Sequence, residues 1–283
     1  MELSAKAFAK LNLYLDVIAK REDGFHDIDS VMQSVSLYDE IRISEKTGEG
    51  VVINYQDPKF NREDDIILKA CELFFDYSGW RSGLNISIIK NIPTVAGLGG
   101  FSADVAAVLR MLNVISGKNY PTKLMLRLCA NLGSDVPFCY DGGAARAGSV
   151  GDALYKLDTV KLYFVFLKEY EKQSTGEMYA KLDSFAIPPS DKINDMMFAV
   201  NLRDASLMAK SVYNVFENCW SFDKMTADFK RFNPDNTLLC GSGPTVAAVF
   251  TSRDRATECY NSLKKEKRFV FFAESVDTGS VIE

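Results

Sequence analysis

The sequence predicts an α+β protein of two domains, and three observations lead to this fold class. The first half joins alternating strand patterns to apolar helical segments, and the second half repeats strand–helix patterns around a buried strand. A chain of 283 residues is long enough for one large or two medium domains. A plausible boundary lies near residues 150–158, so we place the domains at 1–155 and 156–283.

The composition argues against several classes of protein. A net charge of −5 is unfavourable for binding nucleic acid through broad phosphate neutralisation. No apolar run approaches membrane-spanning length, and Met1 leads directly into patterned sequence without a signal peptide. We therefore expect a cytoplasmic protein with neither nucleic-acid nor membrane partners.

The cysteines and the single histidine argue against a resident metal centre. Six cysteines are scattered without a CxxC motif, mostly among apolar neighbours, as is typical of small buried side chains. One histidine cannot supply a histidine-rich metal site. We expect no metal ligands from the protein, and any metal should be a hard cation that arrives with a phosphate.

The first strand is predicted over residues 5–18, where apolar residues alternate with a second set. Lys10 and Asn12 are next neighbours on the second face, about 7 Å apart by strand rise. This face is either a solvated outer surface or the wall of a site. The charged turn 20–27 follows, and its Phe25-His26 pair is either ordinary surface or a grip for a planar ring.

A long strand over 30–44 follows, then a short strand near 51–55 and a helix to Tyr77 whose first turn carries Asp64 and Asp65. A strand over 84–92 then leads into a glycine loop.

The glycine loop spans residues 93–102, with Ser102 opening a helix predicted to end at residue 115. Strand, glycine turn and helix N-terminus together favour an anion site, because free backbone N–H groups point to one place. The simpler alternative is a tight turn with Ser102 as the N-cap. The loop lacks the Lys-Ser/Thr pair of a Walker A loop and the third glycine of a dinucleotide fingerprint.

A second helix is predicted over 122–131, followed by Gly133-Ser134-Asp135 and an apolar run that resembles a strand. Asp135 in such a place is ordinarily a turn or cap residue. A glycine-flanked strand over 142–148 closes the first half.

The second half opens with a buried strand at 162–167 and a helix that begins at Ser174 or Thr175. Tyr179 lies four residues after Thr175, so both can face one cleft. Two strand–helix–strand units packed as a sandwich would fit the remaining patterns, which are helical segments over 193–231, strands over 237–240 and 246–250, a helix over 253–264 and a strand over 269–274.

Three separated segments resemble the GHMP family of small-molecule kinases. They are AKLNLYLDVIAKREDGFHDIDSVMQSVSLYDEI (9–41), the glycine segment PTVAGLGGFSADVAA (93–107) and CGSGPTVAAVF (240–250). The DGFH element is the most specific of these. It resembles the branch that phosphorylates the 2-hydroxyl of a cytidine-diphospho-linked methylerythritol in the non-mevalonate route to isoprenoid precursors.

The resemblance implies a fold, a reaction and its reactants. The fold would join an N-terminal domain like domain 2 of ribosomal protein S5 to a ferredoxin-like αβ sandwich. The reaction would be in-line transfer of the γ-phosphoryl group of ATP, with Mg²⁺, to a small-molecule hydroxyl. Asp135 would act as the base, while Lys10 would orient it and offset developing charge. A monomer or weak dimer is expected.

The resemblance also assigns the binding residues. Asn12 would bind the polyol. Phe25 and His26 would grip the cytosine from one domain, and Thr175 and Tyr179 from the other, with Tyr179 stacked on the ring and His26 reading its edge. Residues 241–245 would support the substrate end. The ATP phosphates would lie against Pro93, Val95, Ala96, Gly97, Leu98, Gly99, Gly100, Phe101, Ser102 and Ala103.

Phe101 departs from the family pattern, because a third glycine usually stands there, and Val95 replaces a smaller residue. Phe101 either reshapes ATP binding or points outward with a negative φ. Two alternatives to the leading interpretation are therefore another GHMP kinase, of the homoserine or mevalonate type, and a non-catalytic nucleotide-binding relative.

Overall fold

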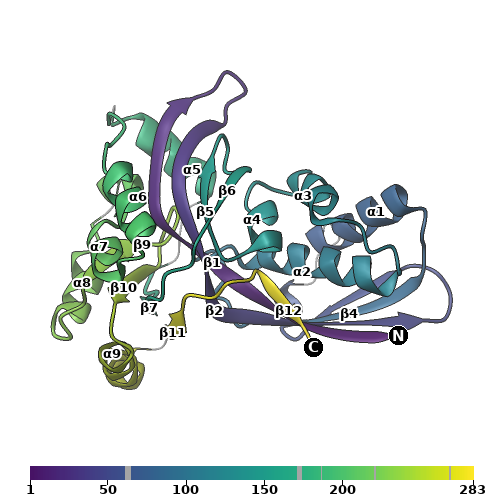
Figure 1. Ribbon diagram of the computed structural model, residues 1–283. Coiled ribbons are helices and arrows are strands. Elements are labelled where there is room, and N and C mark those ends of the chain that lie inside the picture. Colours follow the sequence, from purple (N-terminus) through teal and green to yellow (C-terminus); the bar gives the residue numbers. More distant parts are fainter. Residues whose placement is uncertain (61–64, 171–173, 186, 220, 268) are drawn as a thin grey trace.

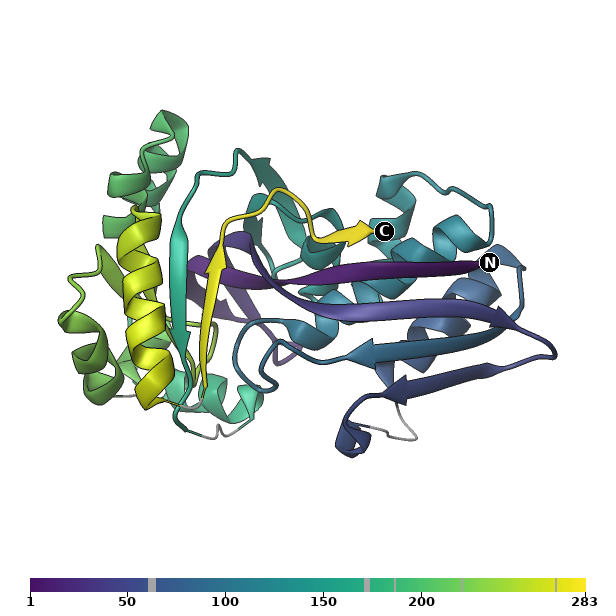
Figure 2. The same cartoon turned by 90° about the horizontal axis from the view of Figure 1, so that it is seen from below.

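The computed structural model describes residues 1–60, 65–170, 174–185, 187–219, 221–267 and 269–283. Helices and two β-sheets make up these residues, which confirms the predicted α+β class (Figure 1). Both chain ends lie at the same end of the molecule (Figures 1 and 2).

The larger sheet has eight strands among the described residues. Five of them follow the order β12-β1-β2-β4-β3, while β5 and β6 extend from β2, and β8 pairs with β1. The strands are β1 (Glu2–Lys20), β2 (His26–Lys46), β3 (Val51–Tyr55), β4 (Gly83–Ile89), β5 (Ala144–Gly148), β6 (Ala153–Leu157), β8 (Tyr213–Asn214) and β12 (Ser280–Ile282).

The long hairpin of β1 and β2 organises this sheet and carries the first part of the site. The two strands pair antiparallel almost throughout, with register shifts at Phe8/Ala9, Asn12/Tyr14 and Val17/Ala19. Such irregularities bend a strand and re-aim its side chains. The middle of β1 is buried on both faces, so the interpretation of its second face as a solvated surface was wrong.

Helix α2 (Gly100–Ile115) packs against β1 and β2, and α1 (Ile66–Ser78) and α4 (Val136–Asp141) flank it. The fully buried Ala103, Ala106 and Ala107 leave little side chain between α2 and its neighbours. The helix begins at Gly100, with Gly99 at the N-cap in left-handed conformation (φ 68°). The prediction of Ser102 as the N-cap was therefore wrong, because glycine supplies the positive φ that this entry requires.

The predicted strand after Asp135 is instead the short helix α4. An apolar run buried on all sides carries no period that separates strand from helix, and Pro137 suits a first helical turn. Helix α3 (Thr122–Ala130) precedes it, close to the predicted range, and the short η1 (Pro58–Phe60) follows β3. Strand β4 ends three residues before its predicted end.

The second sheet is antiparallel, in the order β11-β7-β10-β9, and α8 and α9 pack against its strands (Figure 2). This agrees with the predicted sandwich. Its elements and those near it are β7 (Tyr163–Leu167), α5 (Thr175–Asp183), α6 (Ile193–Leu202), α7 (Ala205–Lys210), η2 (Val215–Asn218), α8 (Asp223–Lys230), β9 (Asn236–Leu239), β10 (Val246–Phe250), α9 (Arg253–Glu266) and β11 (Val270–Glu274).

The two sheets are joined by more than one crossing of the chain. Strands β8 and β12, from the second half, pair with β1, and a bridge links Val35 to Ser275. The division at residues 155 and 156 stays a proposal. Segment 150–158, predicted as a boundary, carries β6 of the larger sheet.

Candidate active site

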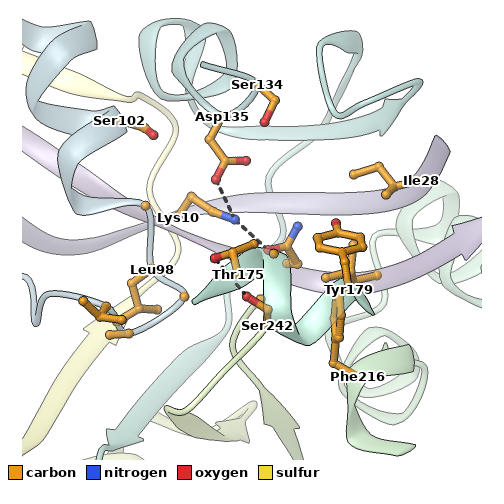
Figure 3. Close-up of a pocket in the computed structure, with 18 of the residues that line it drawn as sticks. Lys10, Ile28, Leu98, Ser102, Ser134, Asp135, Thr175, Tyr179, Phe216 and Ser242 are labelled. Carbon is orange, nitrogen blue, oxygen red and sulfur yellow. Dashed lines mark hydrogen bonds and ion pairs between the residues drawn. The ribbon is translucent and has the colours of Figure 1, made fainter. Parts of the chain in front are cut away.

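A cleft of about 760 Å³ takes its lining from both halves of the chain. Its walls come from the β1–β2 hairpin, the glycine loop, the start of α4, helix α5 and the loop after β9 (Figure 3). The residues predicted to bind or react line this cleft except Ala103, and of segment 241–245 only Gly241 and Ser242 line it. Ala103 is fully buried, and its N–H donates to the carbonyl of Gly99 (2.9 Å).

Lys10 and Asp135 meet in this cleft, although 125 positions separate them in the chain. Lys10 Nζ lies 3.1 Å from Asp135 Oδ2 and donates to Asn12 Oδ1 at 2.9 Å (Figure 3). Side-chain exposure is 8% for Lys10 and 29% for Asp135, so the carboxylate opens to the cleft while the ammonium is nearly buried. The structure thus supplies a positioned acid–cation pair.

Two further hydrogen bonds fix the orientation of the Asn12 side chain. Its amide Nδ2 donates to Ser30 Oγ (2.9 Å), and that hydroxyl donates to the carbonyl of Tyr14 (2.6 Å). The carbonyl of a buried asparagine therefore faces Lys10, which leaves little freedom for either side chain. The register shift between Asn12 and Tyr14 lies beside this chain of hydrogen bonds.

Asp135 stands at the N-cap of α4 but does not cap it. Its side chain makes no capping hydrogen bond, and its backbone lies in the helical region (φ −81°). The carboxylate instead points to Lys10. An aspartate that gives up a cap interaction worth about 1 kcal/mol is consistent with a role in the cleft.

The glycine loop lies directly against Lys10 and the loop after β9. Gly97 (φ 77°) packs so closely on Cys240 that an added Cβ would overlap its carbonyl oxygen. The backbone N–H of Lys10 donates to Leu98 O (3.0 Å), and the Lys10 side chain fills the space where a Cβ of Gly99 would lie. Because these residues are glycines, the loop can lie tightly against Lys10 and Cys240.

The first turn of α2 offers free backbone donors at this loop. The first N–H groups of a helix have no partner within it, and they carry the positive end of the helix dipole. The Gly100, Phe101 and Ser102 residues of that turn all line the cleft. This geometry suits a phosphate, as the glycine pattern predicted.

Phe101 has a helical backbone in the first turn of α2. Its φ is therefore negative, as the second of the two alternatives for this residue requires. Its ring lies 4.6 Å from Lys90 Nζ and meets Phe60 edge-on at 6.3 Å, and the residue is 37% exposed. Val95, by contrast, has a φ of 51°, which is unusual for a β-branched residue. Backbone strain in this loop therefore lies at Val95.

A buried charge cluster behind the loop was not predicted. Lys90 Nζ contacts Asp39 Oδ2 and lies 2.5 Å from Asp104 Oδ2, with both aspartates fully buried. Burial and the neighbouring Asp39 charge raise the pKa of Asp104, while the two carboxylates outweigh burial and raise the pKa of Lys90. Asp39 Oδ1 also accepts the N–H groups of Asn91 (2.6 Å) and Ile92 (2.7 Å), which accounts for the early end of β4.

The other end of the cleft carries the aromatic residues. The His26 and Tyr179 rings stack on each other with centroids 4.6 Å apart and planes at 27°, and Phe216 meets Tyr179 edge-on at 4.9 Å. Burial and the charge of Asp135 raise the pKa of Tyr179 to about 12. Phe25 is 64% exposed. One face of Tyr179, expected to stack on a base, is thus covered by His26.

Thr175 and Ser242 complete this end, with their hydroxyls 3.5 Å apart (Figure 3). Gly241 and Ser242 line the cleft, as predicted for segment 241–245, whereas Thr245 is fully buried. Asp183 and Phe216 were missed by the sequence analysis. Asp183 lies four residues after Tyr179 on α5, a spacing that could have indicated it.

The described residues contain no group of three or more His, Cys, Asp or Glu side chains placed to hold a metal ion. All six cysteines are buried and free. No helix in the described ranges is long and apolar enough to cross a membrane.

Comparison with known proteins identifies relatives over nearly the full chain. The model of the GHMP kinases N terminal domain matches residues 65–143. The 4-diphosphocytidyl-2-C-methyl-D-erythritol kinase of Clostridium kluyveri is 34% identical over 96% of this chain and 99% of its own length. The protein of the same name from Alkaliphilus metalliredigens is 34% identical over 93% of this chain and 92% of its own length.

Solved structures agree on the fold. A crystal structure of 4-(cytidine 5'-diphospho)-2C-methyl-D-erythritol kinase matches with a TM-score of 0.81 at 24% identity, covering 97% of this chain and 99% of the other. A homoserine kinase from Cytophaga hutchinsonii matches with a TM-score of 0.74 at 17% identity, over 100% and 97%. The chain is a kinase of the GHMP superfamily, and within it belongs to the 4-diphosphocytidyl-2-C-methyl-D-erythritol kinase family.

Proposed function

We propose that this protein transfers the γ-phosphoryl group of ATP to the 2-hydroxyl of 4-diphosphocytidyl-2-C-methyl-D-erythritol, a step of the non-mevalonate route to isoprenoid precursors. The relatives that share a third of its residues carry that substrate in their names. The observation that carries the proposal is the Lys10–Asp135 pair, 3.1 Å apart, with a glycine loop on one side and aromatic side chains in the same cleft.

The glycine loop and the start of α2 would hold the ATP phosphates. Backbone donors of Gly100, Phe101 and Ser102 suit the phosphate oxygens, since they need no counter-charge from a side chain. Mg²⁺ would bind mainly through the phosphates that it accompanies, and Ser102, which lines the cleft, would offer a hydroxyl oxygen to it. When bound, the ion neutralises phosphate charge.

Asp135 would accept the proton of the attacking hydroxyl. Phosphoryl transfer through a loose transition state needs little covalent help, so positioning and charge stabilisation dominate. Lys10 holds the Asp135 carboxylate on one side and lies against the phosphate loop on the other. Its ammonium would therefore stabilise the negative charge that develops on the reacting oxygen between Asp135 and the phosphate loop.

The substrate would lie along the remaining wall. Asn12, which accepts a hydrogen bond from Lys10, would bind a polyol hydroxyl, and Thr175 and Ser242 would offer further hydroxyl groups. Phe25, His26 and Tyr179 would bind the cytosine at the aromatic end. A base that hydrogen-bonds in the plane of the His26 ring leaves the His26–Tyr179 stack intact.

A substrate panel with Mg-ATP tests the proposal. We expect turnover of the cytidine-linked polyol and none of homoserine or mevalonate, with the product identified by mass and ³¹P NMR. Turnover of homoserine or mevalonate instead would assign the chain to that activity and overturn the proposal. Stabilisation by the cytidine compound without turnover or Mg-ATP binding would indicate a non-catalytic relative.

A further inference from the structure

Asp183 links the two halves of the chain at the aromatic end of the cleft. It is the last residue of α5, and its Oδ1 lies 2.7 Å from His26 Nε2, at the start of β2. Its other oxygen accepts from Lys20 Nζ at 2.6 Å. Both carboxylate oxygens of Asp183 are therefore engaged by groups of the β1–β2 hairpin.

The charge state of Asp183 decides which atom carries the proton in its contact with His26. The hydrogen bond from Lys20 is the largest cause that lowers the pKa of Asp183, and the hydrogen bond with His26 acts in the same direction. An ionised carboxylate only accepts hydrogen bonds, so His26 Nε2 must donate. In the neutral ring the proton then sits on Nε2, and Nδ1 presents a lone pair.

The ring that presents this lone pair is held firmly. The His26 side chain is 8% exposed, its face stacks on Tyr179, and Tyr179 is braced in turn by Phe216. Within the described ranges, Nδ1 has no hydrogen-bond partner, and it is not among the fully enclosed unpaired atoms. His26 lines the cleft, so Nδ1 remains available to a ligand.

We propose that Asp183 is a positioning residue that fixes His26 in its Nε2-protonated form, so that Nδ1 accepts a hydrogen bond from an amino-bearing pyrimidine and the cleft selects cytosine over uracil. This inference rests on the proposed function, because it concerns the base of that substrate. Asp183 itself would touch no substrate atom and acts only through His26.

The selection follows from the edges of the two bases. Cytosine carries an exocyclic amine that donates, whereas uracil carries a carbonyl oxygen at the same position. A fixed Nδ1 lone pair attracts the amine and repels the carbonyl. In the other tautomer, with the proton on Nδ1, the preference would reverse. Asp183 would therefore determine which of the two bases is preferred, solely by fixing which ring nitrogen of His26 carries the proton.

The single histidine permits a direct measurement of this proton. We would label an untagged chain with ¹⁵N-histidine and record the two ring nitrogens at a pH above the imidazole titration seen in the same spectra. We expect the Nε2-protonated form in the wild type, and a mixture of tautomers in Asp183→Ala. A wild type with the proton on Nδ1 would overturn the proposal whatever the activity.

Kinetics test the consequence for specificity. We compare cytidine- and uridine-linked substrates in wild type, Asp183→Ala, Asp183→Glu and Asp158→Ala, the last of which removes an aspartate paired with Arg203 outside the cleft lining. Asp183→Ala should lower the ratio of kcat/KM for cytidine over uridine by about tenfold or more. Asp183→Glu should restore part of it, and Asp158→Ala should not change it.

The outcomes separate this inference from the proposed function. If the wild type turns over neither substrate, the proposed function fails, and the tautomer measurement still decides whether Asp183 sets the proton position. If Asp183→Ala is folded and loses activity equally on both substrates, Asp183 is merely structural and the inference fails. Unchanged discrimination in Asp183→Ala also overturns it.

Discussion

At the scale of single residues, the proposed mechanism gives Asp135 and Lys10 two tasks that one side chain cannot perform. The carboxylate opens to the cleft and can accept a proton, whereas the nearly buried ammonium keeps a fixed position between carboxylate and loop. Neither side chain is used in its ordinary structural role. Asp135 does not cap α4, and Lys10 does not reach bulk solvent from its strand.

Asp135→Asn should lower kcat at least about 100-fold, because an amide keeps the shape of the side chain but cannot accept the hydroxyl proton. KM for both substrates should change little, and the melting temperature should stay near that of the wild type. Steady-state kinetics with a coupled ADP assay measure this.

The matched control for this substitution is Asp141→Asn, at the far end of the same short helix, where the aspartate pairs with the exposed Lys156. It should keep wild-type kcat. If Asp135→Asn also retains full kcat, Asp135 is not the base, and the mechanism proposed above is wrong.

At the scale of elements, the Lys90–Asp39–Asp104 cluster fixes how a strand passes into the glycine loop. It ties β2, the end of β4 and the first turns of α2 together. Two carboxylates share one ammonium here, so the cluster depends on that cation. Phe101 covers the ammonium with its ring, at the position where the family usually has a third glycine.

Lys90→Met should destabilise the fold by about 3–5 kcal/mol, since it leaves buried carboxylates without their cation. The loss of stability should be partly reversed by adding Asp104→Asn, which removes one of the two buried carboxylates that have lost their cation. Urea unfolding followed by circular dichroism gives the free energy of unfolding.

The exposed pair of Lys156 and Asp141 again supplies a control, because Lys156→Met should cost at most about 1 kcal/mol. A similar small loss for Lys90→Met would show that the cluster contributes little to stability. The position of the glycine loop would then depend on packing alone.

At the scale of the whole molecule, the cleft exists because segments from the two halves touch. Gly97 lies against the backbone of Cys240 and Gly241, and this contact joins the glycine loop to the loop after β9. Val35 and Ser275 form a further backbone link between the sheets. The two walls of the cleft are therefore held at a distance set by backbone contacts.

Gly97→Ala should force these loops apart, because its Cβ would overlap the carbonyl of Cys240 and its φ is 77°. We expect the free energy of unfolding to fall by more than about 2 kcal/mol and kcat/KM to fall with it. Thermal unfolding and steady-state kinetics of the purified variant give both values.

Gly117→Ala separates the effect of backbone strain from the effect of steric overlap. Gly117 has a similar φ of 67°, but an added Cβ would meet nothing within 4 Å, so this variant carries the strain alone. It should cost about 1 kcal/mol and leave kcat unchanged. Equal losses in the two alanine variants would mean that the contact between the loops does not matter.

The sequence by itself determined the features that a few neighbouring residues encode. Alternation predicted β1, the candidate N-cap Ser174 predicted the start of α5, and glycine spacing indicated a candidate phosphate loop. Each depends on backbone geometry over a span of a few residues. The motifs that resemble the kinase family also lie within short segments, which is why Lys10 and Asp135 could be singled out.

Only the tertiary structure decided what depends on residues far apart in the chain. The apolar run after Asp135 forms helix α4, and because it is buried on every side, its pattern carries no period that separates helix from strand. The partners of Lys90 and of His26 are likewise not encoded locally, since Asp39 lies 51 positions from Lys90 and Asp183 lies 157 positions from His26. Such contacts arise from the packing of two sheets, and no short segment specifies that packing.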